Sequence, residues 1–159
     1  MRPISNTTPL VHLARIGLLD LLRDLYGRVD APPAVVREAA RHLGDVFTAV
    51  TRVGWLVEVA VTDKLTADAF ERALGGRGEA EAVALALETP GAILLVDEQA
   101  ARRFARAQGL AVRGSLGVLS DAKRRGLLPA VRPRLDRLRA TGFWLDDETY
   151  ATAVELAGE

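Results

Sequence analysis

Residues 92–98 read AILLVDE, a run of five apolar residues that ends on two acids. An apolar run of this length, without a polar residue at every second position, is typical of a parallel strand covered on both faces. A turn signal, Thr-Pro-Gly at residues 89–91, precedes it. The segment therefore predicts a central strand of a parallel sheet, with Asp97 and Glu98 directly after its carboxyl end.

Strand and helix patterns alternate on both sides of this segment. Pro, Gly, Ser and Thr at the expected boundaries supply start and stop signals for helices. We expect strands at residues 4–6, 29–31, 55–61, 92–96 and 110–113. We expect helices at residues 9–17, 18–25, 79–88 and 115–125, and one that ends at residue 74 after a cap at Thr62-Asp63. A further helix starts at residue 34, and another follows Glu98 and ends at residue 109. A basic helix and a small C-terminal helix complete the chain.

Strands separated by helices of about 10–15 residues require right-handed crossovers, and hence a parallel sheet with helices on both faces. We therefore expect an α/β fold, a three-layer sandwich with a central, mainly parallel sheet flanked by helices. The length of 159 residues and the hydrophobic content of 49% suit a single domain over residues 1–159.

The composition favours a cytoplasmic protein. There is no cysteine, so no disulfide requires an oxidising compartment. The N-terminus has no apolar signal region, and no apolar run approaches the roughly 18 residues that a membrane span needs. We expect no contact with a membrane.

Positive charge is concentrated in one part of a chain whose formal net charge is zero. Residues 99–139 contain eleven Lys or Arg against two acids, Asp121 and Asp136. Such a stretch could hold the phosphate backbone of a nucleic acid, with Arg102 and Arg103 as possible contacts. The alternative is an ordinary solvated helix surface, because arginine outnumbers lysine 19 to 2 in the whole chain.

Oxygen-bearing side chains fall at several expected element ends. Ligands of open parallel sheets bind outside the carboxyl ends of the strands. Asn6 and the pair Asp97-Glu98 are expected at that position. The others are expected in first helical turns, where the helix dipole favours acids even without a function. Since cysteine and paired histidines are absent, a metal bound here would be Mg2+ or Mn2+ rather than zinc. The set is Asn6, Glu38, Glu79, Glu81, Asp97 and Glu98.

Two neighbouring pairs in this set compete for the role of direct ligand. Asp97 and Glu98 point in different directions if either is still extended, so one of them is expected to bind directly. Glu79 and Glu81 lie about 200° apart around a helix, and we favour Glu81.

Four segments together resemble the PIN-domain family, in particular its branch of small, uncharacterised VapC-like bacterial and archaeal proteins. The similarity runs over nearly the whole chain. The segments read ISNTTPL at 4–10, GEAEA at 78–82, LVDE at 95–98 followed by Ala101-Arg102, and GSLGVL at 114–119 followed by Ala122-Lys123.

The resemblance implies a PIN fold with a Mg2+ or Mn2+ site, and an endoribonuclease that hydrolyses RNA phosphodiester bonds. The implied catalytic residues are Glu38, Glu81 and Asp97. The implied metal ligands are Asn6, Glu38, Glu81, Asp97 and Glu98, with Glu79 as a further candidate, and Ser115, Arg102 and Arg103 are the candidates for RNA binding.

The resemblance also implies partners. The protein could be the toxin of a toxin–antitoxin pair, bound by an antitoxin protein. A homodimer is typical of the family, and the apolar helices expected at residues 10–25 offer a surface for it.

The chain departs from the family pattern at Asn6, where PIN nucleases usually have an aspartate after the first strand. The amide removes a negative charge worth roughly 4 kcal/mol gross at about 4 Å and an effective dielectric constant near 20. Metal affinity should be lower. The alternative function is therefore a catalytically weak or inactive PIN domain that acts as a binding or assembly module.

Some residues have simpler interpretations. Ser115 could be an N-cap of the helix that begins there, and His12 and His42 are expected to be ordinary side chains near a helix surface. Trp55 and Trp144 flank apolar runs, which favours core or interface packing over stacking on a base.

Overall fold

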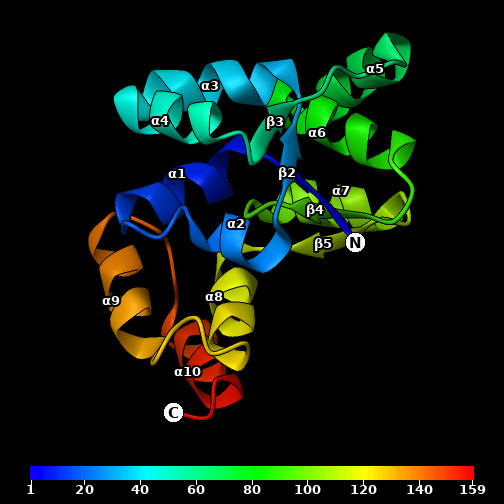
Figure 1. Ribbon diagram of the computed structural model, residues 1–159. Helices are drawn as coiled ribbons and strands as arrows, with labels where there is room; N and C mark the ends of the chain where they lie inside the picture. Colours follow the sequence, from blue (N-terminus) through cyan, green and yellow to red (C-terminus); the bar gives the residue numbers. More distant parts are fainter.

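Five short strands form one sheet in which every neighbouring pair is parallel, in the order β3-β2-β1-β4-β5. The structure is a computed structural model that describes residues 1–159 (Figure 1). The predicted fold class, a parallel sheet between layers of helices, is confirmed. The strands are β1 (Arg2–Ser5), β2 (Val29–Ala31), β3 (Leu56–Glu58), β4 (Ala92–Leu95) and β5 (Ala111–Arg113).

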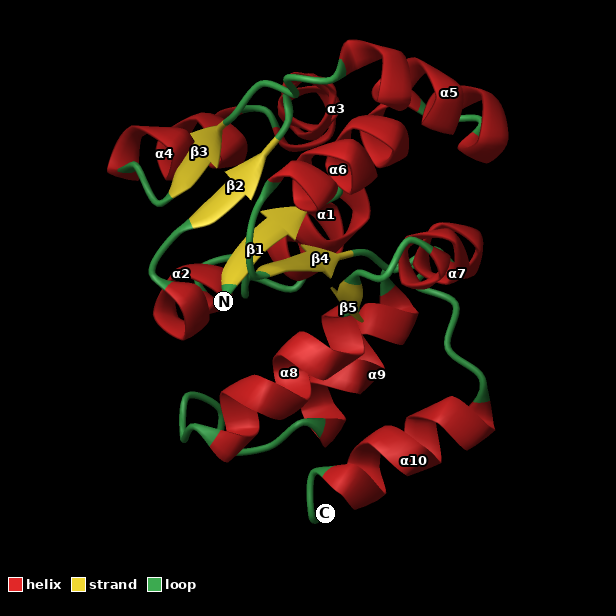
Figure 2. Ribbon diagram, turned by 90° about the vertical axis from the view of Figure 1, so that its right-hand side faces the viewer, coloured by secondary structure: helices red, strands yellow, loops and turns green.

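Ten helices surround the sheet (Figure 2). Helix α6 packs on β1 and β4, with α5 against it and α7 beside it on β5, while α8 packs on α1 and α2. None of the ten combines the length and the apolar character that crossing a membrane would take. They are α1 (Thr7–Arg15), α2 (Leu21–Tyr26), α3 (Pro33–Leu43), α4 (Asp45–Val53), α5 (Lys64–Leu74), α6 (Arg77–Glu88), α7 (Gln99–Ala107), α8 (Ser115–Arg124), α9 (Arg132–Ala140) and α10 (Asp147–Leu156).

The strand order sets the position of the candidate site. From β1 the chain steps outward to β2 and β3, then returns across the sheet to β4 on the other side of β1. The edge between β1 and β4 is thus the switch point, the place where open parallel sheets bind ligands. Ser5 is in register with Leu95, and the amide of Asn6 donates to the Leu95 carbonyl at 2.9 Å. The residues that follow the two strands are therefore neighbours.

Several predicted boundaries are correct. Strand β2 has the predicted bounds, and Asp63 caps α5 by accepting a hydrogen bond from the amide of Thr66. Other boundaries are shifted. Helix α1 begins at Thr7 with Asn6 as its N-cap, α6 begins at Arg77, and β3 covers only three residues of the predicted 55–61.

Helix α4 is absent from the sequence-based prediction. Gly44, with φ of 53°, separates it from α3, and this is a conformation that favours glycine. The signal for α4 is present, because Val46, Phe47, Val50 and Val53 follow a helical spacing.

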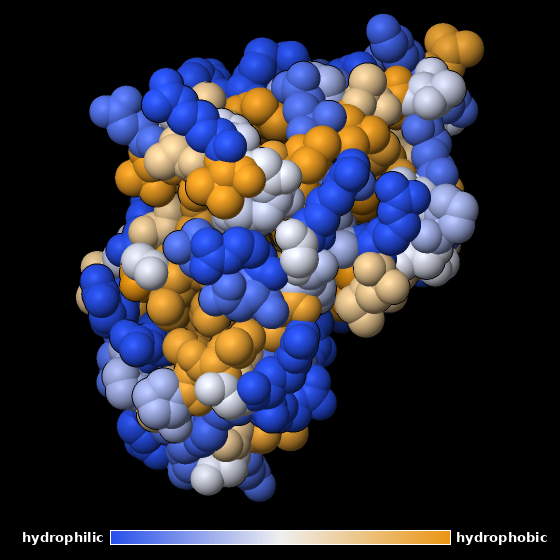
Figure 3. All heavy atoms as spheres, in the orientation of Figure 1, coloured by the Kyte–Doolittle hydropathy of each residue, from blue (hydrophilic) through white to orange (hydrophobic).

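The predicted dimer surface is wrong. The apolar side chains of α1 and α2 are buried, with Leu10, Leu13 and Leu22 fully covered. They are part of the core because α8 packs on both helices. The exposed apolar residues of this region are Val46 and Val53 of α4, at 53% and 67% exposure, and Figure 3 shows apolar side chains at the surface there.

The two tryptophans differ. Trp55 is buried before β3, at 4% exposure, as predicted. Trp144 is 78% exposed, so core packing is wrong for it.

Candidate active site

Asn6 lies at the switch point and is almost fully buried, at 2% exposure. Its amide nitrogen donates to Oε2 of Glu98 at 3.3 Å, which joins the end of β1 to the residue that precedes α7. Its Oδ1 has no hydrogen-bond partner. A buried oxygen without a donor is costly, so this atom marks a place where an additional electropositive group would be favourable.

Glu38 and Glu98 are bound by hydroxyl groups from the first turn of α1. Thr7 Oγ1 donates to Glu38 Oε2 at 2.6 Å, and Thr8 Oγ1 donates to Glu98 Oε2 at 3.1 Å. Glu38 is in the second turn of α3, not the first as expected, so the dipole of α3 does not account for it. Oε1 of each glutamate accepts no hydrogen bond from the protein.

Glu79, the third residue of α6, completes a group of carboxylates. Burial raises the pKa of Glu79, and the negative charges of Glu98 and Glu38 raise it further. We call Glu38, Glu79 and Glu98, together with Asn6, the acidic cluster. No Arg, Lys or His forms an ion pair with any of its three carboxylates. The cluster is therefore a concentration of negative charge that the protein itself does not neutralise.

Gly78 allows the close approach of α3 and α6 at this point. A Cβ atom at position 78 would lie 2.7 Å and 2.9 Å from the two carboxylate oxygens of Glu38. Any side chain there would displace that carboxylate, so the glycine makes room for it.

Glu81 has a different environment from Glu79. Its Oε2 accepts a hydrogen bond from the amide of Ala34 at 3.0 Å, and its Oε1 lies 3.5 Å from Arg77 Nε. Ala34 is in the first turn of α3, whose amides lack partners within the helix. The residue preferred from the sequence thus caps α3, while Glu79 lies beside Glu38 and Glu98.

Asp97 is held by a different set of contacts from the acidic cluster. Its Oδ1 accepts from the Ser115 amide at 2.7 Å, and its Oδ2 accepts from Ser115 Oγ at 2.7 Å. Nδ1 of His12 lies 2.9 Å from the same Oδ2. Gly114 is the N-cap of α8, so Ser115 is not the cap, and its fully buried hydroxyl binds Asp97 instead. We call these residues, Asp97, Ser115 and His12, the Asp97 network.

Arg102 lies beside the Asp97 network. A Cβ atom at Gly114 would be 2.8 Å from Arg102 Nη1 and 3.1 Å from Asp97 Oδ1, so both side chains reach the same glycine. Burial and the charge of Arg106 lower the pKa of Arg102, against the effect of Asp97. Arg102, Arg103 and Arg106 form no ion pair with any acid of the protein, and with Gln99 they line one surface hollow of α7.

The side chains do not form a closed metal site, since no group of three or more Asp, Glu or His residues converges at binding distance. The chemistry of the donors nevertheless fits a hard divalent cation, because all are carboxylate or amide oxygens. The acceptors left for it are the unpaired Asn6 oxygen, the free Oε1 atoms of Glu38 and Glu98, and the carboxylate of Glu79, which no donor of the protein binds.

Sequence reasoning missed the roles of Thr7, Thr8 and His12. Thr7 and Thr8 follow Asn6 directly, and His12 is four residues after Thr8, on the same face of α1. That spacing was the available signal. It places one donor group each against Glu38, Glu98 and Asp97.

A parallel α/β sheet with unneutralised carboxylates at its switch point defines a class of proteins that bind a ligand at this edge. Comparison with family models places the chain more closely, since the PIN-domain model matches residues 2–159. The chain therefore belongs to the PIN-domain family, as the sequence resemblance predicts. The PIN fold is nuclease-like, and PIN domains generally depend on divalent metals. No curated protein and no solved structure gives a significant match.

Proposed function

We propose that this protein is a metal-dependent ribonuclease that hydrolyses RNA phosphodiester bonds at the acidic cluster. The observation that carries the proposal is the unpaired, buried Oδ1 of Asn6 beside Glu38 and Glu98, two carboxylates that accept hydrogen bonds from Asn6, Thr7 and Thr8 and have no basic partner. A cation bound among the carboxylates of Glu38, Glu79 and Glu98 would lower the free energy of their mutual repulsion. Glu38, Glu79, Glu98 and Asn6 would hold Mg2+ or Mn2+, with Glu79 in place of Glu81.

The cation, when bound, neutralises the nonbridging phosphate oxygens and lowers the pKa of a coordinated water. The chain's own residues supply position. Thr7 and Thr8 orient the carboxylates of Glu38 and Glu98. Asp97 keeps the N-terminus of α8 and the ring of His12 next to the site. In this role Asp97 is a positioning residue, because all its donors come from the protein.

The proposed RNA contacts are the guanidinium groups of α7. Arg102, Arg103 and Arg106 have no carboxylate partner, so no ion pair must be broken when a phosphate binds them. Other arginines of the basic stretch are engaged: Arg113 binds Asp121, and Arg139 binds Asp147. Arg132, Arg134 and Arg137 of α9 also lack an ion pair, and α7 is preferred because Arg102 lies beside Asp97 at this edge of the sheet. Ser115, whose hydroxyl binds Asp97, is not placed among the RNA contacts.

The alternative is a weak or inactive PIN domain that serves as a binding or assembly module. It is favoured by the amide at Asn6 and by the lack of convergence of the carboxylates. A toxin role, an antitoxin partner and a homodimer belong to the proposal as well. What supports the homodimer is the exposed apolar pair on α4, Val46 and Val53.

Cleavage of a mixed RNA pool with added Mg2+, with added Mn2+ and with EDTA tests the proposal. We expect fragments with either metal and none with EDTA. Calorimetric titration of the metal-free protein with Mn2+ should show binding. Binding without cleavage would support the module, and cleavage in EDTA would contradict the proposed chemistry.

A further inference from the structure

Trp144 is an exposed aromatic ring in the segment between α9 and α10. Its neighbours Phe143 and Leu145 turn inward, Leu145 being buried at 9% exposure, while Trp144 is 78% exposed. In this segment side chains alternate between the protein and solvent, as in an extended chain. The outward direction of the indole is therefore set by the extended backbone, and not by a gap in the packing of the core.

The backbone on both sides of Trp144 is held in place. The Phe143 ring packs edge-on against His12, with centroids 4.7 Å apart and an interplanar angle of 85°. The amide of Phe143 donates to the Leu138 carbonyl at 3.2 Å, and the Leu145 carbonyl accepts from Arg139 Nε at 3.1 Å. An aromatic ring on a fixed backbone loses little conformational freedom when it binds a ligand.

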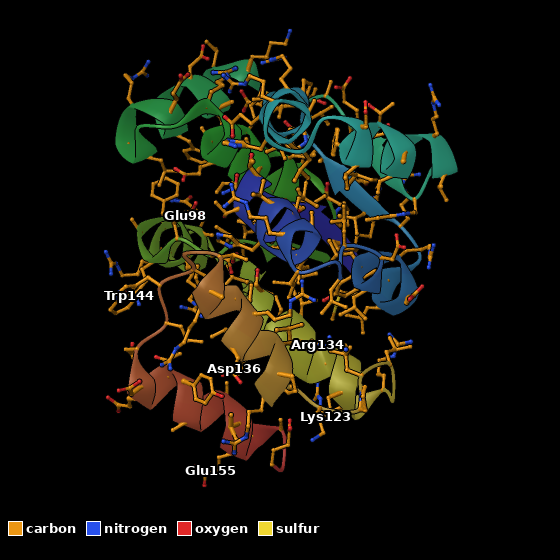
Figure 4. The ribbon with its side chains drawn as sticks, turned by 90° about the vertical axis from the view of Figure 1, so that its left-hand side faces the viewer. Glu98, Lys123, Arg134, Asp136, Trp144 and Glu155 are labelled. Carbon is orange, nitrogen blue, oxygen red and sulfur yellow. The ribbon has the colours of Figure 1, made fainter.

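A cavity joins this ring to the Asp97 network. It has a volume of about 360 Å³, and its lining includes Asp97, Gln99, Arg102, Leu116 and Trp144. This volume suits a small organic group, since ligand sites span roughly 300–1,000 Å³. In Figure 4, Trp144 and Glu98 lie on the same side of the molecule, with α7 next to both.

The walls of this cavity differ in chemistry. The lining combines the indole ring and the apolar side chain of Leu116 with one cation, Arg102, which also lines the hollow with Arg103 and Arg106. Two acids line it as well, and both are bound within the protein: Asp97 by Ser115 and His12, and Asp146 by Thr149. A ligand that matches both the indole ring and the guanidinium group has a flat aromatic part and an anionic part. A nucleotide in a single strand has this composition, and an unpaired base offers the free face that stacking needs.

We propose that Trp144 stacks on one nucleobase of single-stranded RNA, while Arg102 binds an adjacent phosphate. This inference rests on the proposed function, because it places the stacked nucleotide beside the nucleotide that would be cut. Trp144 would thus be a substrate-positioning residue that selects unpaired RNA over duplex. Stacking on an aromatic ring tolerates every base, so the preference concerns strandedness more than sequence.

Binding in EDTA tests stacking without cleavage. A short single-stranded RNA should quench the fluorescence of the exposed Trp144, while the buried Trp55 contributes a constant signal. We expect Trp144→Ala to weaken RNA binding between about 5- and 150-fold, the range for loss of one stacked base, and Trp144→Phe to retain most of the affinity. Leu156→Ala, which removes another exposed apolar side chain at 75% exposure, is the matched control and should bind as the wild type.

Two further ligands separate stacking from a structural effect. Inorganic polyphosphate has the charge without the bases, and its affinity should be unchanged in Trp144→Ala. An RNA with single abasic nucleotides at successive positions should bind wild type and Trp144→Ala equally well when the missing base is the stacked one. Equal RNA affinity of the two proteins, or an equal loss for polyphosphate, would overturn the proposal. In that case Trp144 would be a contact for a protein partner or part of the scaffold.

A cleavage assay with Mn2+ keeps this inference separate from the proposed function. Loss of RNA binding in Trp144→Ala together with metal-dependent cleavage by the wild type supports both. Loss of binding without any cleavage by the wild type retains the stacking site and rejects the nuclease. Cleavage by the wild type with unchanged binding by Trp144→Ala rejects only the stacking site.

Discussion

Asp97 and Glu98 are adjacent in the chain, but they belong to two regions with different electrostatics. Asp97 receives three short contacts from Ser115 and His12, and both of its oxygens are occupied. Glu98 receives two long hydrogen bonds on one oxygen, and its other oxygen is free. Glu98 also lies close enough to Glu79 to raise the pKa of Glu79.

The difference shows how one strand end can provide both structure and a reactive site. The Asp97 network satisfies the first turn of α8 and is complete within the protein. The acidic cluster is incomplete, since its carboxylates have no basic partner and the Asn6 oxygen has no donor. A partly buried region whose polar groups lack partners is where a ligand changes the free energy most. Substitutions in the two regions should therefore have different effects.

The largest effect is expected from Glu98→Gln, which removes charge from the acidic cluster. Metal-dependent RNA cleavage should fall by at least about 100-fold, because a ligand charge near the cation is worth several kcal/mol. Initial rates with Mn2+ measure it. Glu81→Gln is the matched control: its carboxylate caps α3, so cleavage should stay within a few-fold of the wild type. Equal losses of cleavage in Glu98→Gln and Glu81→Gln would contradict the different roles assigned to the two glutamates.

Asp97→Ala should act mainly on stability. Removal of the carboxylate leaves the buried donors of Ser115 without a partner, at a cost of about 2–3 kcal/mol. For a chain of this length the Tm should drop by about 5–10 °C. Thermal and urea unfolding measure both quantities. Asp97→Asn keeps an acceptor oxygen and should lose less, whereas equal losses would indicate that charge alone matters.

Asn6→Asp should strengthen the acidic cluster as a cation site. One more negative charge should raise Mn2+ affinity by about 10-fold or more, measured by calorimetry. Without metal the variant should be less stable than the wild type, because four carboxylates then repel one another. A gain in cleavage supports a weakened nuclease, and unchanged cleavage supports the binding module.

Gly78→Ala should disturb the acidic cluster without unfolding α6. The new methyl group displaces the Glu38 carboxylate, and cleavage should fall by about 5- to 10-fold. Stability should be unchanged or higher by up to about 1 kcal/mol, because alanine favours the helix over glycine. Kinetic and urea-unfolding measurements on the same sample test it. A lower free energy of unfolding together with the lower cleavage rate would indicate that the substitution damages the fold as a whole.

The smallest effect concerns pH. Burial and neighbouring acids raise the pKa of Glu79 above its ordinary value of 4.5, so the folded state binds its proton more tightly than the unfolded state. The cost to stability is therefore absent below pH 4.5 and complete above the raised pKa. Glu79→Gln should stabilise the metal-free protein at pH 7 and leave it unchanged at pH 4. Unfolding curves at both pH values check this, and added Mn2+ should stabilise only the wild type.

The sequence predicts the fold well because its signals are local. The apolar run at 92–96 predicted β4, and the Pro-Pro pair at 32–33 marked the start of α3. The edge that carries Asn6 and Glu98 followed from the rule for parallel sheets. Helix α4 is not predicted although its spacing is helical, because a single glycine at position 44 is a weak signal for a break between two helices.

The finer geometry of the site could not be predicted from the sequence. Whether Glu79 or Glu81 faces Glu38 depends on how α6 is rotated against α3, and packing between distant segments fixes that rotation. The direction of Asp97 depends on Ser115, which is 18 residues away in the chain. The exposure of Trp144 depends on the inward packing of Phe143 against His12. Such contacts have no local signal.

The start of α1 has a consequence for what this chain can tolerate. Thr7, Thr8 and His12 bind Glu38, Glu98 and Asp97 from three positions within two helical turns. One inserted residue between positions 8 and 12 would rotate the rest of the helix by about 100°. His12 would then leave Asp97 while both threonines kept their acids. Length changes in this short stretch should therefore be far more damaging than substitutions on its solvent side.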